Sequence, residues 1–183
     1  MLWYIVTAAI HVTISGLISS PRTPVGRVRA VLGSIRHETR IRRSADEVWQ
    51  LVGDAARLHE WFPGITSSPV DGTNRLITTD AGLAMPEEIL VVDPIQHRFQ
   101  YRLTSPVIRH HRGTIDVIDL EDATCLVTYS TEADPRAMAL VIGGATAGAL
   151  DELRRQMETE PMPDHHTDGP DHATGPDHAN GNV

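Results

Sequence analysis

Two side chains in the middle of the sequence could move protons: the carboxyl group of Glu87 and the imidazole of His111. Each lies in an alternating segment and falls on its apolar side. An inward carboxylate is costly unless it is paired or hydrogen-bonded, and burial raises its pKa. Glu87 and His111 could therefore pair, and as an acid/base couple they could catalyse enolisation or aldol-type cyclisation. Alternatively, they satisfy each other or a water and only orient a bound ligand.

The sequence gives little support for a disulfide framework, a phosphate-binding loop, a metal site or a nucleophile. The single cysteine, Cys125, sits in an alternating run and excludes a disulfide framework. The stretch Gly143–Gly148 is glycine-rich, but it lies inside a predicted helix and not between a strand and a helix, so a phosphate-binding loop is rejected. Histidines in the tail (His165, His166, His172 and His178) have no rigid ligand spacing. We therefore expect no metal and no cofactor, and the lack of a nucleophile motif favours binding over catalysis.

The elements that must position these groups follow from periodicity. Residues 34–42 alternate and predict a half-buried strand. Ser44 and Glu47 form a capping box that starts a helix ending at Gly53, and 55–61 predicts a second short helix before Pro63. Alternating segments then predict strands at about 65–71, 74–80, 84–93, 97–104, 108–120 and 124–133. Short connections between them imply antiparallel hairpins.

A long helix is predicted from Asp134-Pro135 to about Met157. Gly143, Gly144 and Gly148 lie within it, and each costs about 1 kcal/mol relative to alanine. Either the glycines let the helix approach the sheet closely, or they leave volume for a ligand.

Both ends differ from the middle, so we divide the chain into 1–33, an apolar extension and linker, 34–158, one folded domain, and 159–183, a His/Asp/Gly/Pro-rich tail predicted to be disordered. Residues 1–20 have no charged side chain, which suggests a membrane anchor or a start codon assigned too far upstream. The predicted location is cytoplasmic, and an anchor here would also keep the domain in the cytoplasm.

The charge of the domain excludes one class of partner. Residues 33–158 contain 13 arginines and 19 acidic residues. An acidic domain has no electrostatic reason to bind nucleic acid, because Lys/Arg neutralisation of phosphates drives that binding. We expect no nucleic-acid partner, and contact with a membrane only if residues 1–20 act as an anchor.

The order strand, two helices, hairpin-rich sheet and long final helix resembles the START-like/Bet v 1-like (SRPBCC) superfamily, in particular its bacterial polyketide cyclase/dehydrase and lipid-transport branch. The matching residues include Trp49, the Trp61-Phe62-Pro63 turn, Pro86–Ile89 and His111-x-Gly113. The resemblance covers about residues 34–157. It implies an α+β helix-grip fold, in which a curved antiparallel sheet wraps around the C-terminal helix and encloses a cavity for lipids, polyketides or similar molecules.

We therefore predict a protein that binds a hydrophobic small molecule in an internal cavity without catalysis. The alternative is a polyketide cyclase or dehydratase that uses Glu87 and His111 as its catalytic acid/base pair. The predicted ligand-binding residues are those that face inward by alternation or lie at the turn and glycine positions: Trp61, Phe62, Glu87, Ile89, Val91, Phe99, Tyr101, His111, Tyr129, Val141, Gly144 and Gly148.

Overall fold

The computed structural model describes residues 31–159. Residues 1–30 and 160–183 lie outside the described part, and so do the predictions made for the apolar extension, the linker and the His-rich tail. The elements in chain order are β1 (Gly33–Ile41), α2 (Ala45–Val52), the 3-10 turn η1 (Ala55–Arg57), α3 (Leu58–Trp61), β2 (Ile65–Ser67), β3 (Val70–Asp71), β4 (Asn74–Thr79), β5 (Ala84–Asp93), β6 (Arg98–Leu103), β7 (His110–Asp119), β8 (Cys125–Asp134) and α4 (Arg136–Thr159).

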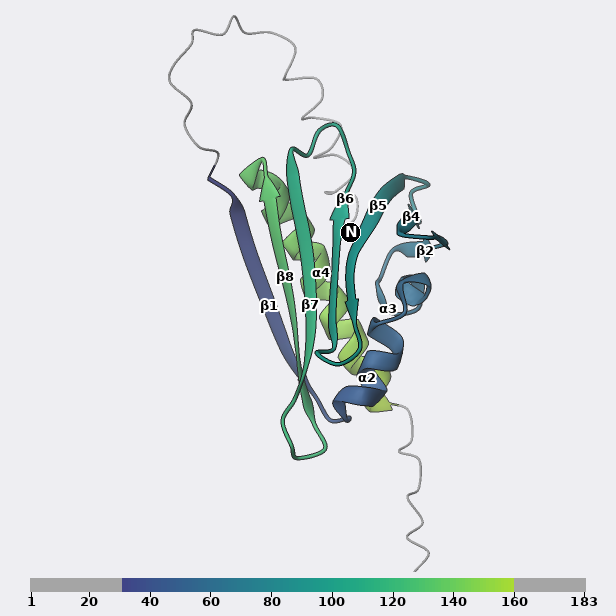
Figure 1. Ribbon diagram of the computed structural model, residues 1–183, viewed down its shortest axis with the longest axis vertical. Helices are drawn as coiled ribbons and strands as arrows, with labels where there is room; N and C mark the ends of the chain where they lie inside the picture. The colour runs from purple at the N-terminus through teal and green to yellow at the C-terminus, as the bar shows by residue number, and fades with distance from the viewer. Residues whose placement is uncertain (1–30, 160–183) are drawn as a thin grey trace, which may run out of the picture.

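The strands form one antiparallel sheet in the order β1-β8-β7-β6-β5-β4-β2, with β3 paired to β4. The sheet curves around α4, and the short helices α2 and α3 lie at its open side (Figure 1). The predicted helix-grip architecture is confirmed. One difference is local: the segment predicted as a strand at 65–71 is two short strands, separated by Ser68 and Pro69, and a proline has no N–H to donate to a strand ladder.

Local sequence explains where α2 begins and ends. The Ser44 hydroxyl accepts the backbone N–H of Glu47, and the Glu47 carboxylate accepts the N–H of Ser44, which completes the predicted capping box. Gly53 caps the other end through its N–H to the carbonyl of Trp49. The apolar face of α2 (Ala45, Val48, Leu51 and Val52) is buried, so the helix is held by packing as well as by its cap.

Alternation predicts the faces of the long strands correctly. On β6, Phe99 and Tyr101 are buried whereas Arg98 and Arg102 are exposed. On β7 the buried positions are His111, Gly113, Ile115 and Val117, and on β8 Cys125, Val127 and Tyr129 are buried. These inward side chains, together with those of α2, α3 and α4, form the main core.

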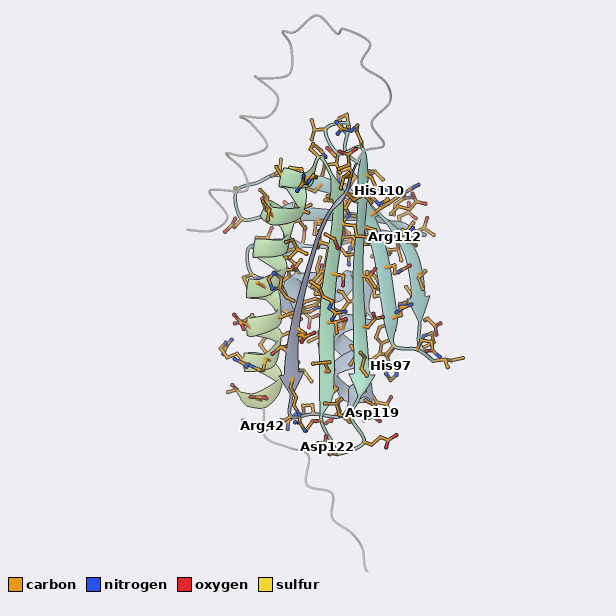
Figure 2. All side chains as sticks on the ribbon, turned by 90° about the vertical axis from the view of Figure 1, so that its left-hand side faces the viewer. Arg42, His97, His110, Arg112, Asp119 and Asp122 are labelled. Carbon is orange, nitrogen blue, oxygen red and sulfur yellow. The ribbon has the colours of Figure 1, made fainter. Side chains whose placement is uncertain are left out.

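Helix α4 packs closely against β1 and β8, and Figure 2 shows it along one side of the sheet. A Cβ at Gly143 would lie 2.8 Å from Cγ2 of Ile35, and one at Gly33 would lie 2.7 Å from the carbonyl oxygen of Arg136. Both glycines therefore permit an approach that larger residues would prevent. At Gly144 and Gly148 an added Cβ would meet no atom within 4 Å, so these two glycines have no such role.

Candidate functional site

A cavity of about 150 Å³ lies between α4, α3 and the inner face of the sheet from β4 to β8. Residues of the loop between β6 and β7 also line it, near the end of the sheet at which Figure 2 labels His110. Its lining is mostly apolar and consists of Leu58, Phe62, Ile65, Ile77, Leu83, Ala84, Met85, Pro86, Glu87, Tyr101, Leu103, Ser105, Val107, Ile108, Tyr129, Met138, Ile142 and Ala145. An apolar cavity of about this volume can hold one benzene-sized ring.

Helix α4 contributes Met138, Ile142 and Ala145 to this lining. Their spacing of four and three residues places them on one face of the helix. Ala145 is the smallest of the three, and the space beside it belongs to the cavity. The helix therefore has one face toward the cavity and another, through Gly143, against β1.

A buried ion pair lies at the cavity: its carboxylate partner, Glu87, belongs to the lining, and its cationic partner, Arg75, does not. Arg75 on β4 and Glu87 on β5 are direct cross-strand partners, and each side chain is only 3% exposed. The guanidinium donates from Nε to Oε2 of Glu87 at 2.7 Å and also contacts that oxygen through Nη2 at 2.6 Å. Its Nη1 donates to the carbonyl of Ala55 at 3.2 Å, so Arg75 also ties β4 to η1.

Aromatic rings surround the same guanidinium. The Arg75 carbon Cζ lies 5.2 Å from the ring centres of both Phe99 and Tyr101. Such cation–π contacts partly compensate a cation that has been removed from water. The pKa of Glu87 is raised to about 7 because burial penalises the carboxylate, and Arg75 opposes part of this shift. The carboxyl group can therefore exchange a proton near neutral pH.

Two tyrosines complete the polar wall. The hydroxyl groups of Tyr101 on β6 and Tyr129 on β8 are hydrogen-bonded to each other at 2.6 Å, and both rings are buried. Burial is the main cause that raises the pKa of both phenols, and the negative charge of Glu87 adds to the shift of each. Both hydroxyls are therefore neutral at physiological pH and keep their protons.

His111 lies next to the two tyrosines but does not share their hydrogen bond. Its Nδ1 accepts the backbone N–H of Leu103 at 3.0 Å, and its ring centre is 5.4 Å from that of Tyr101. Burial lowers the pKa of His111 to about 4, and the nearby His110 adds to the shift. The imidazole is therefore neutral with its proton on Nε2, an atom that has no hydrogen-bond partner among the described residues.

The pairing predicted between Glu87 and His111 is not formed. Glu87 pairs with Arg75, and His111 bonds to the backbone of Leu103. The reason lies in the strand order, because β6 lies between β5 and β7. Two strand spacings amount to about 10 Å, which is too far for a direct hydrogen bond. As an acid/base couple the two groups would have to act without contact.

The structure brings four of the twelve predicted ligand-binding residues together around the cavity: Phe62, Glu87, Tyr101 and Tyr129. The other eight lie outside its lining. Trp61, Phe99 and His111 are buried behind it, and Ile89 and Val91 line a wide, open depression beside Trp49 on α2. On α4, Val141, Gly144 and Gly148 lie off the cavity face, and Gly148 is exposed to solvent.

Sequence reasoning missed Arg75, the partner that the buried carboxylate requires. A signal existed in the segment 74–79, where Arg75, Ile77 and Thr79 are buried and alternate with more exposed residues. The short connection between the predicted strands 74–80 and 84–93 makes them a hairpin, which can bring Arg75 opposite Glu87. The lining residues of α4 were missed as well, two of them by a single position along the helix.

Two further observations concern partners and location. Within 31–159 no cluster of three or more His, Cys, Asp or Glu side chains is placed to hold a metal ion. No helix in that range has both the length and the apolar character needed to cross a bilayer. The cytoplasmic location and the possible anchor at residues 1–20 stay predictions.

Comparison with known proteins gives a consistent result. The family described as polyketide cyclase/dehydrase and lipid transport matches residues 33–158. No curated protein matches the sequence.

Three solved structures show the likeness in fold. The protein XoxI from Bacillus cereus is 23% identical, with a TM-score of 0.65 over 69% of this chain and 96% of that one. Norcoclaurine synthase from Thalictrum flavum, in complex with dopamine and hydroxybenzaldehyde, is 20% identical, with a TM-score of 0.59 over 79% of this chain and 98% of that one. The Zhui aromatase/cyclase from Streptomyces sp. R1128 is 16% identical, with a TM-score of 0.58 over 70% and 94%.

Proposed function

The chain belongs to the polyketide cyclase/dehydrase and lipid transport family, and from this premise we propose that its cavity binds a compact hydrophobic small molecule without converting it. The observation that supports this most is the mostly apolar space of about 150 Å³ between α4 and the sheet. Its volume suits a single ring or a short branched chain, whereas pockets for drug-sized ligands measure roughly 300–1,000 Å³.

The arrangement of the polar groups favours binding over catalysis. Arg75 is paired with Glu87, donates to the Ala55 carbonyl and does not line the cavity. His111 lies outside the lining, and its Nδ1 already accepts a backbone N–H. A base must come within hydrogen-bond reach of the proton that it removes, and His111 has no such access. The polar wall is therefore suited to orient a ligand.

The test is a methyl NMR titration of the full chain with toluene. We expect shifts at the cavity methyl groups of Ile77 and Ile142, and none at Val117, which is buried outside the lining. An Ala145→Leu variant, which fills the space beside α4, should lose binding at least tenfold. Ala137→Leu makes the same change at an exposed position of α4 and should bind as the wild type does. Equal binding by both variants would contradict the proposal.

One observation favours a second candidate, a cyclase or dehydratase: the Glu87 carboxyl lines the cavity and has its pKa raised to about 7. Glu87 alone would then act as the proton-transfer group. The test uses a ligand that co-purifies with the wild type, and mass spectrometry measures whether the protein converts it. This candidate is supported if the wild type converts the ligand and the Glu87→Gln variant binds it without converting it.

A further inference from the structure

The bonded pair of tyrosine hydroxyls leaves one proton without an acceptor. Two neutral phenols carry two O–H donors, and the single bond between Tyr101 and Tyr129 uses only one of them. Apart from this bond, neither hydroxyl has a hydrogen-bond partner among the described residues. Whichever oxygen accepts the mutual bond keeps a free O–H in a fully buried position.

The spare donor belongs to one of two residues that line the cavity. Both tyrosines belong to the lining, and most of their neighbours there are aliphatic or aromatic side chains without an acceptor. A buried donor without a partner costs about 1–3 kcal/mol, so a ligand that supplies an acceptor gains from satisfying it. Hydroxyl groups rotate about the C–O bond, and the donor can turn toward an oxygen in the cavity.

The charges nearby restrict what kind of acceptor fits. The charge of Arg75 is already paired with the Glu87 carboxylate, and Arg75 does not line the cavity, so it does not present a free cation to an anionic ligand. An anionic ligand would also lie close to the Glu87 carboxylate in a site from which water is largely excluded. A neutral oxygen acceptor avoids both costs.

We propose that the Tyr101–Tyr129 pair recognises a carbonyl oxygen, so that the ligand class is a compact, uncharged, mostly apolar ketone or aldehyde of about one ring in size. This inference rests on the proposed binding function and specifies its ligand. The remaining lining supplies hydrophobic contact around the carbonyl-bearing molecule, and the pair determines its orientation.

The experiment compares two probe compounds of nearly the same shape, acetophenone and α-methylstyrene, in which a carbonyl oxygen replaces a methylene group. Their dissociation constants are measured by methyl NMR titration for the wild type and for the double variant Tyr101→Phe/Tyr129→Phe. The double variant removes both partners of the mutual bond, so it leaves no orphaned hydroxyl and keeps both rings. Its thermal unfolding temperature serves as the check on folding.

The readout is the ratio of the two affinities in each protein. The unbound ketone is better hydrated than the alkene, but this difference is the same for both proteins and therefore cancels when the two ratios are compared. We expect the double variant to lose about fivefold in its preference for acetophenone, with binding of α-methylstyrene nearly unchanged. If both compounds bind in the cavity and the ratio is the same in both proteins, the carbonyl inference is overturned while the binding function stands. If neither compound binds to the wild type, both are overturned.

Discussion

The two sides of α4 show how one helix can both seal a sheet and leave a cavity. Toward β1 and β8 the contact is close: Gly143 meets Ile35, and Gly33 meets the backbone of Arg136. Toward β4, β5 and β6 the same helix presents Met138, Ile142 and Ala145 across an open space of about 150 Å³. We refer to these regions as the seam and the cavity side.

The comparison separates the two possible roles of small residues in the helix. At the seam, Gly143 acts by permitting close approach. On the cavity side the small residue is Ala145, and no glycine of α4 lines the space. Glycine content alone therefore did not indicate where the volume lies. The cavity side also contains the buried ion pair and the tyrosine pair, so it should respond to substitution through charge and hydrogen bonding, and the seam through packing.

The largest effect is expected on the cavity side, from Glu87→Leu. The substitution leaves the Arg75 guanidinium buried without its partner, which costs about 3–5 kcal/mol of unfolding free energy. Arg75→Met should cost less, because Glu87 can take up a proton and become neutral. Urea denaturation of each variant measures the difference.

The double variant Arg75→Met/Glu87→Leu provides the control. Replacing a buried ion pair by apolar residues of similar volume is often neutral, so the double variant should recover most of the stability that Glu87→Leu loses. Additive losses in the double variant would show that the ion pair is not the cause.

The next effect is expected from Gly113→Ala on β7. A Cβ at this position would overlap the ring of Tyr101. Because the ring is buried and bonded to Tyr129, it has little room to move, and we expect a loss of about 2–3 kcal/mol. Chemical denaturation measures it, and an unchanged midpoint would mean that the wall around the tyrosine pair is loose.

The pH dependence of stability should reveal two opposing groups, Glu87 in the cavity lining and His111 outside it. Folding raises the pKa of Glu87 to about 7, so its contribution is lost as the pH rises from about 4.5 to 7. Folding lowers the pKa of His111 to about 4, so its contribution is lost as the pH falls from 6.5 toward 4. Between pH 4.5 and 6.5 the two contributions cancel.

Replacing His111 by leucine should expose the Glu87 contribution. The variant should become less stable as the pH rises through this window, by up to about 1.4 kcal/mol per pH unit relative to the wild type. Urea midpoints at several pH values give the slope. If the urea midpoints of the variant and the wild type change with pH in the same way, the imidazole is not both neutral and buried.

The smallest effect tests the seam. Gly143→Ala forces Ile35 to move and should cost about 1 kcal/mol after its gain in helix propensity. Gly144→Ala meets nothing within 4 Å and should stabilise the protein by roughly 0.5–1 kcal/mol. Thermal unfolding of this matched pair should give shifts of opposite sign. Shifts of the same sign would remove the distinction between the seam and the rest of the helix.

The sequence predicts the fold well because strand alternation and turn residues act locally. The faces of β6, β7 and β8 follow directly from the period of two. The face of α4 that points to the cavity was harder to predict, because the helix is rich in small residues and has no strong apolar stripe. The predicted Val141, Gly144 and Gly148 each precede a residue of the buried or lining face: Ile142, Ala145 and Ala149.

The charged part of the site shows a different limit. The separation of Glu87 from His111 follows from consecutive hairpins, which place β6 between their strands. The Arg75–Glu87 pair depends on the exact hairpin register, which a turn signal alone does not fix. The cavity itself depends on how far the sheet stands from α4, a distance that no local pattern encodes.

The most direct measurement is mass spectrometry of small molecules that co-purify with the full chain from its own host, compared with the Ala145→Leu variant prepared in parallel. We expect a neutral, mostly apolar compound of about one ring with a carbonyl oxygen, at one per chain in the wild type and depleted at least tenfold in the variant. Equal amounts of the same compound in both preparations would contradict a ligand site inside the cavity.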